Sequence, residues 1–340
     1  MKFDANLRPL RLADVSTEAA RYEEMGFDSV WSFESAHDPF LPLAQAALNT
    51  TKLGIGTNIA VAFARSPFAT AQTAWDLQAA SGGRMVLGLG TQVRAHVERR
   101  FSMQFEHPAA RVTDYVDCVR AIWKTYQTGE RPSHEGPFYR FSLINDFFNA
   151  GPIDHPEIPI YLAGVNERMC RAAGEVADGF QAHPMHSAAY IQEVVRPELE
   201  AGAKKRDRNA NDIAIHIPTF VVMGETEAER SAMEQSVRRQ ISFYASTPSY
   251  RRFLEFHGFQ DIGRPLSDLM RRGELDEMPK MVPDALVEIV TLWGNGAELG
   301  AQLKARVKAA GAARASLYHN VSPNDPVSMW KDIADGYKAA

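Results

Sequence analysis

Polar residues follow the ends of several apolar runs, and these are the side chains that could do chemistry in this chain. Glu34 comes directly after the run 27–33, and His37 lies shortly beyond it. A carboxylate and an imidazole in such positions can act as an acid, a base or a hydrogen-bond partner. The alternative for Glu34 is structural, as a cap of the following helix or as an ion-pair partner of Arg65 or Arg94.

Two glycine-bearing turns could approach a ligand with their backbone. Gly88–Gln92 ends an apolar run, and Gly164–Asn166 precedes a predicted helix. At the second turn, free N–H groups and the helix dipole favour an anion, so this turn could hold a phosphate. The alternative is that the glycines serve tight turns for backbone reasons alone.

The remaining histidines are scattered and give no metal-binding spacing. The sequence has no His-x-His motif, no cysteine cluster and no Gly-x-Ser-x-Gly motif, so we expect neither a metal site nor a serine nucleophile. Few titratable groups among many apolar residues favour a reaction carried by an organic cofactor. The histidines concerned are His96, His183, His186 and His319.

The segment 52–92 predicts the unit that positions these residues. Its first part, 52–61, is β-branched and apolar, as a strand buried on both faces should be. A helix then begins at Ser66 and Pro67 and ends at Gly82, and 85–90 is a second buried strand. A strand, a helix and a strand in this order predict parallel pairing.

The same alternation continues along the chain and predicts one (β/α)8 TIM barrel over residues 1–340, with insertions at about 92–157 and 247–283, after strands four and seven. A doubly wound sheet is the alternative. In a TIM barrel the active site lies at the C-terminal strand ends, where the residues above are found. The predicted strands are 2–6, 27–33, 52–61, 85–90, 158–163, 178–183, 213–223 and 315–319, and the main helices are 11–25, 41–50, 67–81, 108–128, 167–177, 187–206 with a kink at Pro197, 226–245, 284–310 and 326–338.

Composition narrows the class of protein. A net charge of −5 gives no reason to expect nucleic acid or an anionic membrane as partner. Two cysteines, Cys118 and Cys170, predict buried thiols in a reducing, cytoplasmic setting. We expect no signal peptide and no membrane-spanning segment, because the first residues lead straight into a strand and no apolar run is long enough.

Four stretches in this order resemble the bacterial luciferase-like superfamily. They are Phe27–Trp31, Gly56–Val61 followed by Arg65-Ser66-Pro67, Gly83–Thr91, and Pro159–Gly164 with Ala177–Phe180. Within that superfamily, Gly90–His96 and Ser246–Arg251 are most similar to the deazaflavin-dependent oxidoreductases of actinobacteria. The resemblance covers nearly the whole chain and implies a TIM barrel that binds coenzyme F-420 or reduced FMN.

The resemblance also implies site residues. In deazaflavin members a non-prolyl cis peptide ends strand three and bulges against the back of the ring, and here it would be Asn58–Ile59. Such a bond costs about 3–4 kcal/mol, so it marks a position that needs it. Thr91 and Gln92 would lie beside the ring or its ribityl chain. The phosphate would be held by Gly164, Val165 and Asn166, with His183 and His186 close by.

Three departures from the family pattern limit what can be carried over. Many deazaflavin relatives have Asp-His where this chain has Glu34-Ser35, with His37 beyond. Val93 stands where the sugar-phosphate dehydrogenases of the family have a carboxylate, which argues against a sugar phosphate as substrate. No lysine set for the acidic tail of the coenzyme is evident. Its candidates are Arg94, Arg168 and Arg171.

Together with these observations, the resemblance implies a cytoplasmic oxidoreductase that moves a hydride between coenzyme F-420 and a small organic molecule, and family likeness implies a homodimer. Glu34, His37 or His96 would exchange the accompanying proton. The aromatic wall of its pocket would come from Phe63, Phe101, Phe105, Tyr139, Phe253 and Phe256. Three alternatives remain: an FMN-dependent monooxygenase, a flavin-binding protein without turnover, and an aldolase or isomerase. The last needs a Schiff-base lysine or a paired acid, which the strand ends do not offer.

Overall fold

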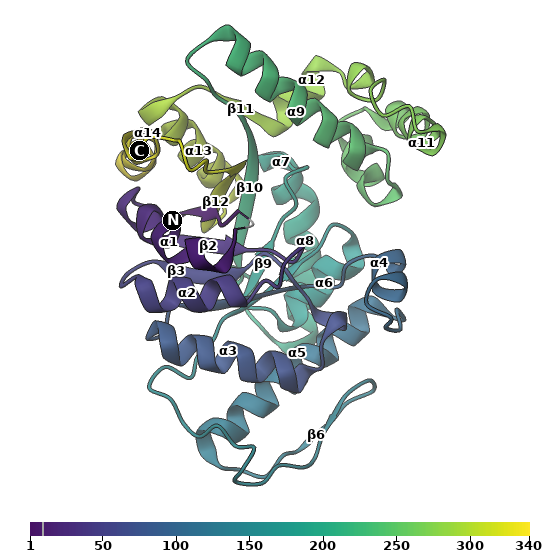
Figure 1. Ribbon diagram of the computed structural model, residues 1–340. Coiled ribbons are helices and arrows are strands. Elements are labelled where there is room, and N and C mark those ends of the chain that lie inside the picture. Colours follow the sequence, from purple (N-terminus) through teal and green to yellow (C-terminus); the bar gives the residue numbers. More distant parts are fainter. Residues whose placement is uncertain (9) are drawn as a thin grey trace. The chain divides into compact units, whose positions relative to one another are not determined.

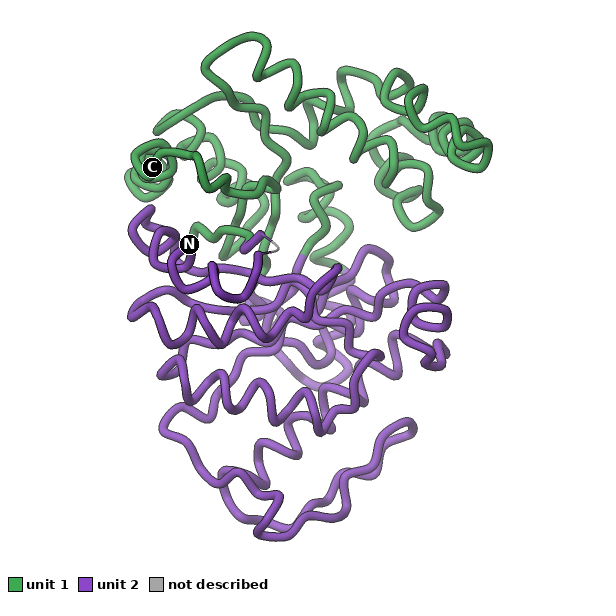
Figure 2. The backbone as a smooth tube through the Cα atoms, in the orientation of Figure 1, with its two compact units in different colours: residues 1–6, 182–197, 215–340 green, residues 7–181, 198–214 purple. Residues whose placement is uncertain are grey.

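Figure 1 shows the computed structural model, which describes residues 1–8 and 10–340. The chain divides into two units that are described separately below (Figure 2). Unit 1 consists of residues 1–6, 182–197 and 215–340, and unit 2 of residues 7–181 and 198–214. The prediction of one domain over the whole chain stays a prediction.

Unit 2 contains a parallel sheet in which β2, β3, β5, β8 and β9 pair in that order. Val30 pairs with Ile55, Ile55 with Met85, and Leu87 with Ile160. All of these side chains are buried, as expected for strands covered on both faces. The strands of unit 2 are β2 (Ser29–Ser32), β3 (Gly54–Thr57), β4 (Ala60–Val61), β5 (Met85–Gly90), β6 (His134–Glu135), β7 (Arg140–Phe141), β8 (Ile160–Ala163) and β9 (Gly179–Gln181).

The helices of unit 2 follow the strands in the predicted order. The segment 67–81 is helical as predicted: the Ser66 hydroxyl accepts a hydrogen bond from Ala69 N, and Gly82 ends the helix with φ +63°. Glycine is favoured there because other residues are strained in the left-handed region. The helices are α1 (Leu12–Glu24), α2 (Leu41–Asn49), α3 (Pro67–Ser81), α4 (Arg94–Arg99), α5 (Pro108–Thr128) and α6 (Glu167–Val176).

The predicted third strand is interrupted. It forms β3 and the short β4, and the Asn58–Ile59 peptide between them is cis, as the resemblance implied. β4 then pairs with the end of β5, Ala60 with Leu89 and Val61 with Gly90. The two halves of the strand therefore both lie against β5, with residues 58–59 standing between them.

One arginine, Arg84, connects the segments that lead into β3 and β5. The Arg84 guanidinium, just before β5, donates to the carbonyl oxygens of Ala47, Thr50, Leu53 and Ser81. These groups belong to the end of α2, the segment before β3 and the end of α3. Arg84 thus satisfies carbonyl oxygens that helix ends leave without an intrahelical partner.

In the insertion after β5, the segment that carries the β6–β7 hairpin is hydrogen-bonded to α5. Asp114 is buried and accepts hydrogen bonds from His134 Nε2 (2.8 Å), Phe138 N (2.7 Å) and Tyr139 N (2.8 Å). A Cβ on Gly136 would lie 1.7 Å from Asp114 Oδ1, so only glycine fits at that position. The antiparallel hairpin of β6 and β7, predicted for 134–141, is confirmed.

The strands of unit 1 pair in parallel in the order β11, β10, β12, β1. The buried Asp4 of β1 accepts two hydrogen bonds from Arg314 of the neighbouring strand, at 2.7 and 3.0 Å. Its strands are β1 (Lys2–Asn6), β10 (Ala214–Val222), which begins in unit 2, β11 (Thr291–Trp293) and β12 (Arg314–Asn320).

Two helical predictions for this part of the chain need correction. The segment 284–310 is not one helix, because Thr291–Trp293 pairs with β10 as a strand and Gly294 follows with φ +144°. The helix 187–206 contains a π-helical stretch, Ile191–Val195, just before Pro197, whose missing N–H disrupts the normal pattern. The helices are α7 (Ala188–Tyr190), α8 (Arg196–Ala203), which ends in unit 2, α9 (Glu227–Ala245), α10 (Arg251–Phe256), α11 (Gly263–Arg272), α12 (Asp284–Val290), α13 (Gly296–Ala310) and α14 (Val327–Ala339).

Together the units supply β1, β2, β3, β5, β8, β9, β10 and β12, which are parallel strands separated by helices. These are the elements of a (β/α)8 TIM barrel. β11 extends the sheet of unit 1, and the sequence analysis missed it.

Candidate active site

Glu34, Arg65 and Asp38 form an ion-pair cluster after β2 in unit 2, called the carboxylate cluster below. Arg65 Nη1 donates to both oxygens of Glu34 (2.9 and 2.8 Å), and Arg65 Nη2 donates to Asp38 Oδ2 (2.7 Å). The Glu34 side chain is only 8% exposed and also accepts Val61 N at 2.7 Å. The structural alternative for Glu34, pairing with Arg65, is confirmed.

The rest of this cluster is also engaged with the backbone. Asp38 Oδ1 accepts Phe40 N (2.8 Å) and Leu41 N (3.1 Å), so Asp38, rather than Glu34, is hydrogen-bonded to the start of α2. Burial raises the pKa of Asp38, but these N–H groups and Arg65 outweigh it and lower the pKa below its usual value. His37, by contrast, is exposed.

Backbone hydrogen bonds join residues 58 and 59 to β2 and to the residues after it. Asn58 N donates to Ser32 O (2.7 Å), and Glu34 N donates to Ile59 O (3.0 Å). A Cβ added to Gly90 would lie 2.8 Å from Ile59 Cδ1, so the Ile59 side chain rests on the bare backbone of β5. Asn58 and Ile59 themselves are half-buried.

The next glycine on β5 allows an even closer approach. A Cβ on Gly88 would lie 1.7 Å from Thr57 O, a backbone atom that cannot move aside. Thr57 Oγ1 donates to Gly88 O (2.6 Å) and accepts Gly88 N (2.9 Å). Gly88 is therefore required by the packing of β3 on β5, which supports the backbone alternative for this glycine.

Thr91, Gln92 and His96 follow β5. Gln92 is left-handed (φ +57°), and its side-chain oxygen accepts Val93 N at 3.0 Å. His96 lies on α4, half-buried, and its Nδ1 is a buried atom without a hydrogen-bond partner among residues 1–8 and 10–340. Of the predicted acid–base residues, His96 alone combines burial with an unused ring nitrogen in the described chain.

The predicted phosphate turn precedes α6. Asn166 caps this helix by accepting Met169 N at 3.1 Å. A Cβ on Gly164 would lie 2.9 Å from Met169 Cβ, so glycine brings the turn close to the helix it precedes. This geometry fits both the predicted anion site and the simpler explanation of a tight turn.

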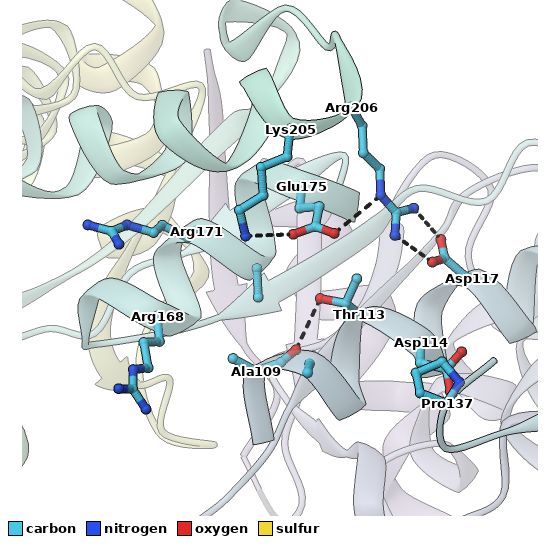
Figure 3. A pocket seen from close by; sticks show the side chains of 12 residues that line it. Ala109, Thr113, Asp114, Asp117, Pro137, Arg168, Arg171, Glu175, Lys205 and Arg206 are labelled. Carbon is cyan, nitrogen blue, oxygen red and sulfur yellow. Dashed lines mark hydrogen bonds and ion pairs between the residues drawn. The ribbon is translucent and has the colours of Figure 1, made fainter. Parts of the chain in front are cut away.

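A groove of about 540 Å³ is lined by residues of α5 and α6, by Pro137 and by residues 205–206 (Figure 3), and residues 164–166 are not part of its lining. Lys205 pairs with Glu175 (3.0 Å), and Arg206 pairs with Asp117 (2.8 Å). Arg171 is paired with Glu198, and Arg94 with Glu98. Of the three arginines predicted for an acidic tail, Arg168 is the one without an ion pair in the described part of the chain, and it lines the groove.

In unit 1, His183 follows β9. Its Nδ1 accepts Met185 N at 3.1 Å, and burial together with nearby His186 lowers its pKa to about 3. His186 is buried and bonds through Nδ1 to His183 O (2.9 Å). Burial and the charge of Arg306 lower the pKa of His186 to about 3. Both rings are therefore uncharged at neutral pH.

Three tyrosines around His183 escaped the sequence analysis: Tyr244, Tyr250 and Tyr318. Tyr318 adjoins His319, which had been singled out instead. Neighbouring side chains of a strand point to opposite faces, and the His319 ring stacks on Trp330 of α14, whereas Tyr318 contacts Phe220 of β10. The alternation of side chains along the strand is the sequence signal that could have indicated Tyr318.

The predicted aromatic wall separates into two clusters. In unit 2, Phe63 contacts Phe105 at 6.0 Å, and the Arg111 guanidinium lies over the rings of Phe63 (4.8 Å) and Tyr139 (5.5 Å). In unit 1, Phe253 and Phe256 both contact Tyr190, at 5.2 and 5.4 Å. Each cluster is described within its own unit.

Among residues 1–8 and 10–340, no three or more His, Cys, Asp and Glu side chains gather in a way that could hold a metal ion. Of the helices in the same residues, none has both the length and the apolar character that crossing a bilayer requires.

Comparison with known proteins assigns the family. The family model for luciferase-like monooxygenases matches residues 4–314. An uncharacterized protein of Mycobacterium tuberculosis is 42% identical over 287 residues, covering 84% of each chain. A 5,10-methylenetetrahydromethanopterin reductase of Methanolobus tindarius is 26% identical over 278 residues, covering 80% of each.

The solved structure of the coenzyme F-420-dependent tetrahydromethanopterin reductase from Methanopyrus kandleri superimposes with a TM-score of 0.78 at 19% identity, over 98% of this chain and 97% of that one. This match confirms the predicted TIM barrel, and the doubly wound alternative is wrong. With the family model matching most of its length, the chain belongs to the luciferase-like monooxygenase family.

Proposed function

We propose that this protein is an oxidoreductase that transfers a hydride between coenzyme F-420 and a small organic molecule. The observation that carries the proposal is the contact between the β3–β4 break and the end of β5, where Ile59 rests on the side-chain-free backbone of Gly90. A branched aliphatic side chain on bare backbone suits the flat face of a tricyclic ring. The fold shared with a reductase named for this coenzyme supports the choice of a deazaflavin.

The residues present also fit the polar end of such a cofactor. The backbone of Gly164–Asn166 at the start of α6 would hold the phosphate, because helix N-termini favour anions. Arg168, which follows on the same helix and lines the groove formed by α5 and α6, would meet the acidic tail. Thr91 and Gln92 would contact the ring or its ribityl chain.

The chain's own residues would handle the proton. When bound, the deazaflavin supplies hydride exchange at its C5. We assign proton exchange with the substrate to His96, because its Nδ1 is buried and unused in the described chain. Glu34 would instead hold the 58–61 segment through Arg65 and Val61 N. His37, being exposed, is the second candidate for the proton.

Cofactor titration of Asn166→Asp tests the proposal. Aspartate can keep the helix cap while adding a negative charge, so the helix should remain stable while repulsion weakens phosphate binding at least about tenfold. Asn145→Asp is the matched control, since Asn145 also accepts a backbone N–H (Phe148 N, 3.3 Å) in an exposed turn. Binding is followed by the change in cofactor fluorescence. Equal affinity of both variants for coenzyme F-420 would contradict the assigned phosphate site.

An FMN-dependent monooxygenase is the second candidate, favoured by the description of the matching family model. The two differ in oxygen chemistry, because reduced deazaflavin does not readily activate oxygen. Purified protein is titrated with FMN and with coenzyme F-420, and oxygen uptake is measured with each reduced cofactor. Tight FMN binding with oxygen consumption would replace the first proposal, and binding without any turnover would favour a flavin-binding protein.

A further inference from the structure

Four aromatic side chains gather in unit 1, and we call them the tyrosine box: His183, Tyr244, Tyr250 and Tyr318, which is linked to the others through Tyr244. The His183 ring centroid lies 4.3 Å from that of Tyr244 and 4.6 Å from that of Tyr250. The rings of Tyr244 and Tyr250 are 5.5 Å apart. All four residues are half-buried, so their rings pack together yet remain partly accessible.

The box is built from strand ends and from the insertion after β10. His183 follows β9, and Tyr318 lies near the C-terminal end of β12, packed on Phe220 of β10 at 5.2 Å. Tyr244 lies in the last turn of α9, and Tyr250 lies in the 3-10 turn Pro248–Tyr250. C-terminal strand ends are where TIM barrels bind substrates.

The two hydroxyl groups of Tyr244 and Tyr318 are 3.0 Å apart. Each phenol has one proton to donate, and one hydrogen bond between them uses one proton. Whichever tyrosine donates, the O–H of the other stays available. The pair therefore always offers one donor and several lone pairs to a third group.

His183 provides a second hydrogen-bond donor, the Nε2–H of its ring. Because its Nδ1 accepts Met185 N, the neutral ring carries its proton on Nε2. That Nε2–H has no hydrogen-bond partner within the described residues. The box thus combines an N–H and an O–H donor with aromatic faces.

The box carries no charge. Burial raises the pKa of Tyr244 and of Tyr250, with Tyr318 adding to both, so the phenols stay protonated. Burial lowers the pKa of His183 to about 3, with His186 adding to the effect, so this ring stays neutral. None of these rings offers a positive charge, so an anion bound by them alone would lose its water without compensation, which is costly.

We propose that the tyrosine box binds the substrate, and that the substrate is an uncharged molecule with a carbonyl or hydroxyl oxygen on a compact apolar or aromatic body. The oxygen would accept from the free O–H of the Tyr244–Tyr318 pair and from His183 Nε2–H. The apolar body would lie among the aromatic faces. This inference rests on the proposed function, which it deepens by naming the substrate class.

The test compares two probes that share a ring but differ in charge, acetophenone and benzoate. Binding to the full-length protein without cofactor is measured by nuclear magnetic resonance titration. Acetophenone should bind at least about tenfold more tightly than benzoate, since burying an unpaired carboxylate is costly. Equal or tighter binding of benzoate would overturn the proposal.

Variants locate the probe. The double variant Tyr244→Phe with Tyr318→Phe removes both hydroxyl groups and keeps the rings, so acetophenone binding should weaken about 3- to 10-fold. Tyr337→Phe, which removes a hydroxyl bonded to Lys2 O elsewhere in unit 1, is the matched control and should bind acetophenone as the unmodified protein does. Unchanged acetophenone binding by the double variant would overturn the proposal.

Titration of the same samples with coenzyme F-420 tests the proposed function separately from the tyrosine box. Cofactor binding without acetophenone binding would contradict the tyrosine box alone. Acetophenone binding that needs the two hydroxyl groups, without cofactor binding, would support the box and contradict the proposed function.

Discussion

The carboxylate cluster of unit 2 and the tyrosine box of unit 1 both stand after barrel strands, yet they use polar atoms in opposite ways. In the carboxylate cluster, Arg65 and backbone N–H groups occupy the carboxylate oxygens. In the tyrosine box, His183 Nε2–H and one phenol proton are left over. A polar group whose hydrogen bonds are all made within the protein stabilises the fold, whereas a polar group with an unused donor or acceptor can bind a ligand.

The strongest test of the first region concerns the backbone beneath it. Gly88→Ala would force a Cβ to 1.7 Å from Thr57 O, so we expect a loss of at least about 3 kcal/mol in the free energy of unfolding. Gly82→Ala is the control: its φ is +63°, but nothing lies within 4 Å of the new Cβ, so about 1 kcal/mol is expected. Denaturant unfolding measures both. Equal losses would contradict the close contact between β3 and β5.

Glu34→Gln tests whether the carboxylate cluster is structural. The change leaves Arg65 without its main partner in a mostly buried site, so we expect a loss of about 3 kcal/mol in unfolding free energy. Glu98→Gln breaks the exposed pair with Arg94 and should cost less than about 0.5 kcal/mol. A Glu34→Gln protein of normal stability that has lost turnover would instead support the catalytic hypothesis for this residue.

Acid should weaken unit 1 through its buried histidines. Burial, with a nearby arginine in each case, lowers the pKa of His186 and of His216 to about 3, from an ordinary value of 6.5. Between these values the unfolded chain binds more protons than the folded one, so stability is full above the upper value and falls as the pH decreases. Each histidine should cost about 2 kcal/mol near about pH 5.

His186→Asn is the variant that checks this pH dependence. Asparagine can keep a donor to His183 O but does not titrate, so the fall in unfolding free energy between about pH 7 and about pH 5 should shrink by about 2 kcal/mol. The readout is a series of denaturant titrations across that range. A slope identical to that of the unmodified protein would show that another group causes the acid sensitivity.

The smallest effect is expected in the tyrosine box itself. Tyr318→Phe removes a half-buried hydroxyl whose partner can turn to solvent, so about 0.5 kcal/mol of unfolding free energy should be lost. Tyr115→Phe removes a buried hydroxyl bonded to Thr70 Oγ1 (2.6 Å) and should cost about 1.5 kcal/mol. The opposite ranking would indicate that the box is a structural feature.

Much of the fold could be predicted because local signals agreed with burial. Residues 67–81, 85–90 and 108–128 have the predicted bounds, since apolar spacing coincides with a Ser66 cap, a Pro108 start and glycine ends. The strand at Thr291–Trp293 was missed because the apolar run 286–292 fits a helix as well as a strand, and only the glycines after it mark the break.

The candidate site was less predictable, because its residues interact through contacts that are remote in the sequence. Strand ends indicated where to look, and the pairing of Glu34 with Arg65 was among the alternatives. Tyr244 and Tyr250 belong to a helix end and an insertion, where no periodicity marks a functional side chain. His319 was named among the strand ends; its ring stacks on Trp330, whereas the neighbouring Tyr318 contacts Phe220.

Arg84 has a consequence for how such a protein can diversify. Its guanidinium donates hydrogen bonds to the carbonyl oxygens of Ala47, Thr50, Leu53 and Ser81, which all precede β3 or β5. These bonds lie at the opposite end of each strand from the turn that follows it. Turns at the outgoing ends can therefore be exchanged by an engineer grafting new specificities, while the starts of two adjacent strands stay held by this arginine.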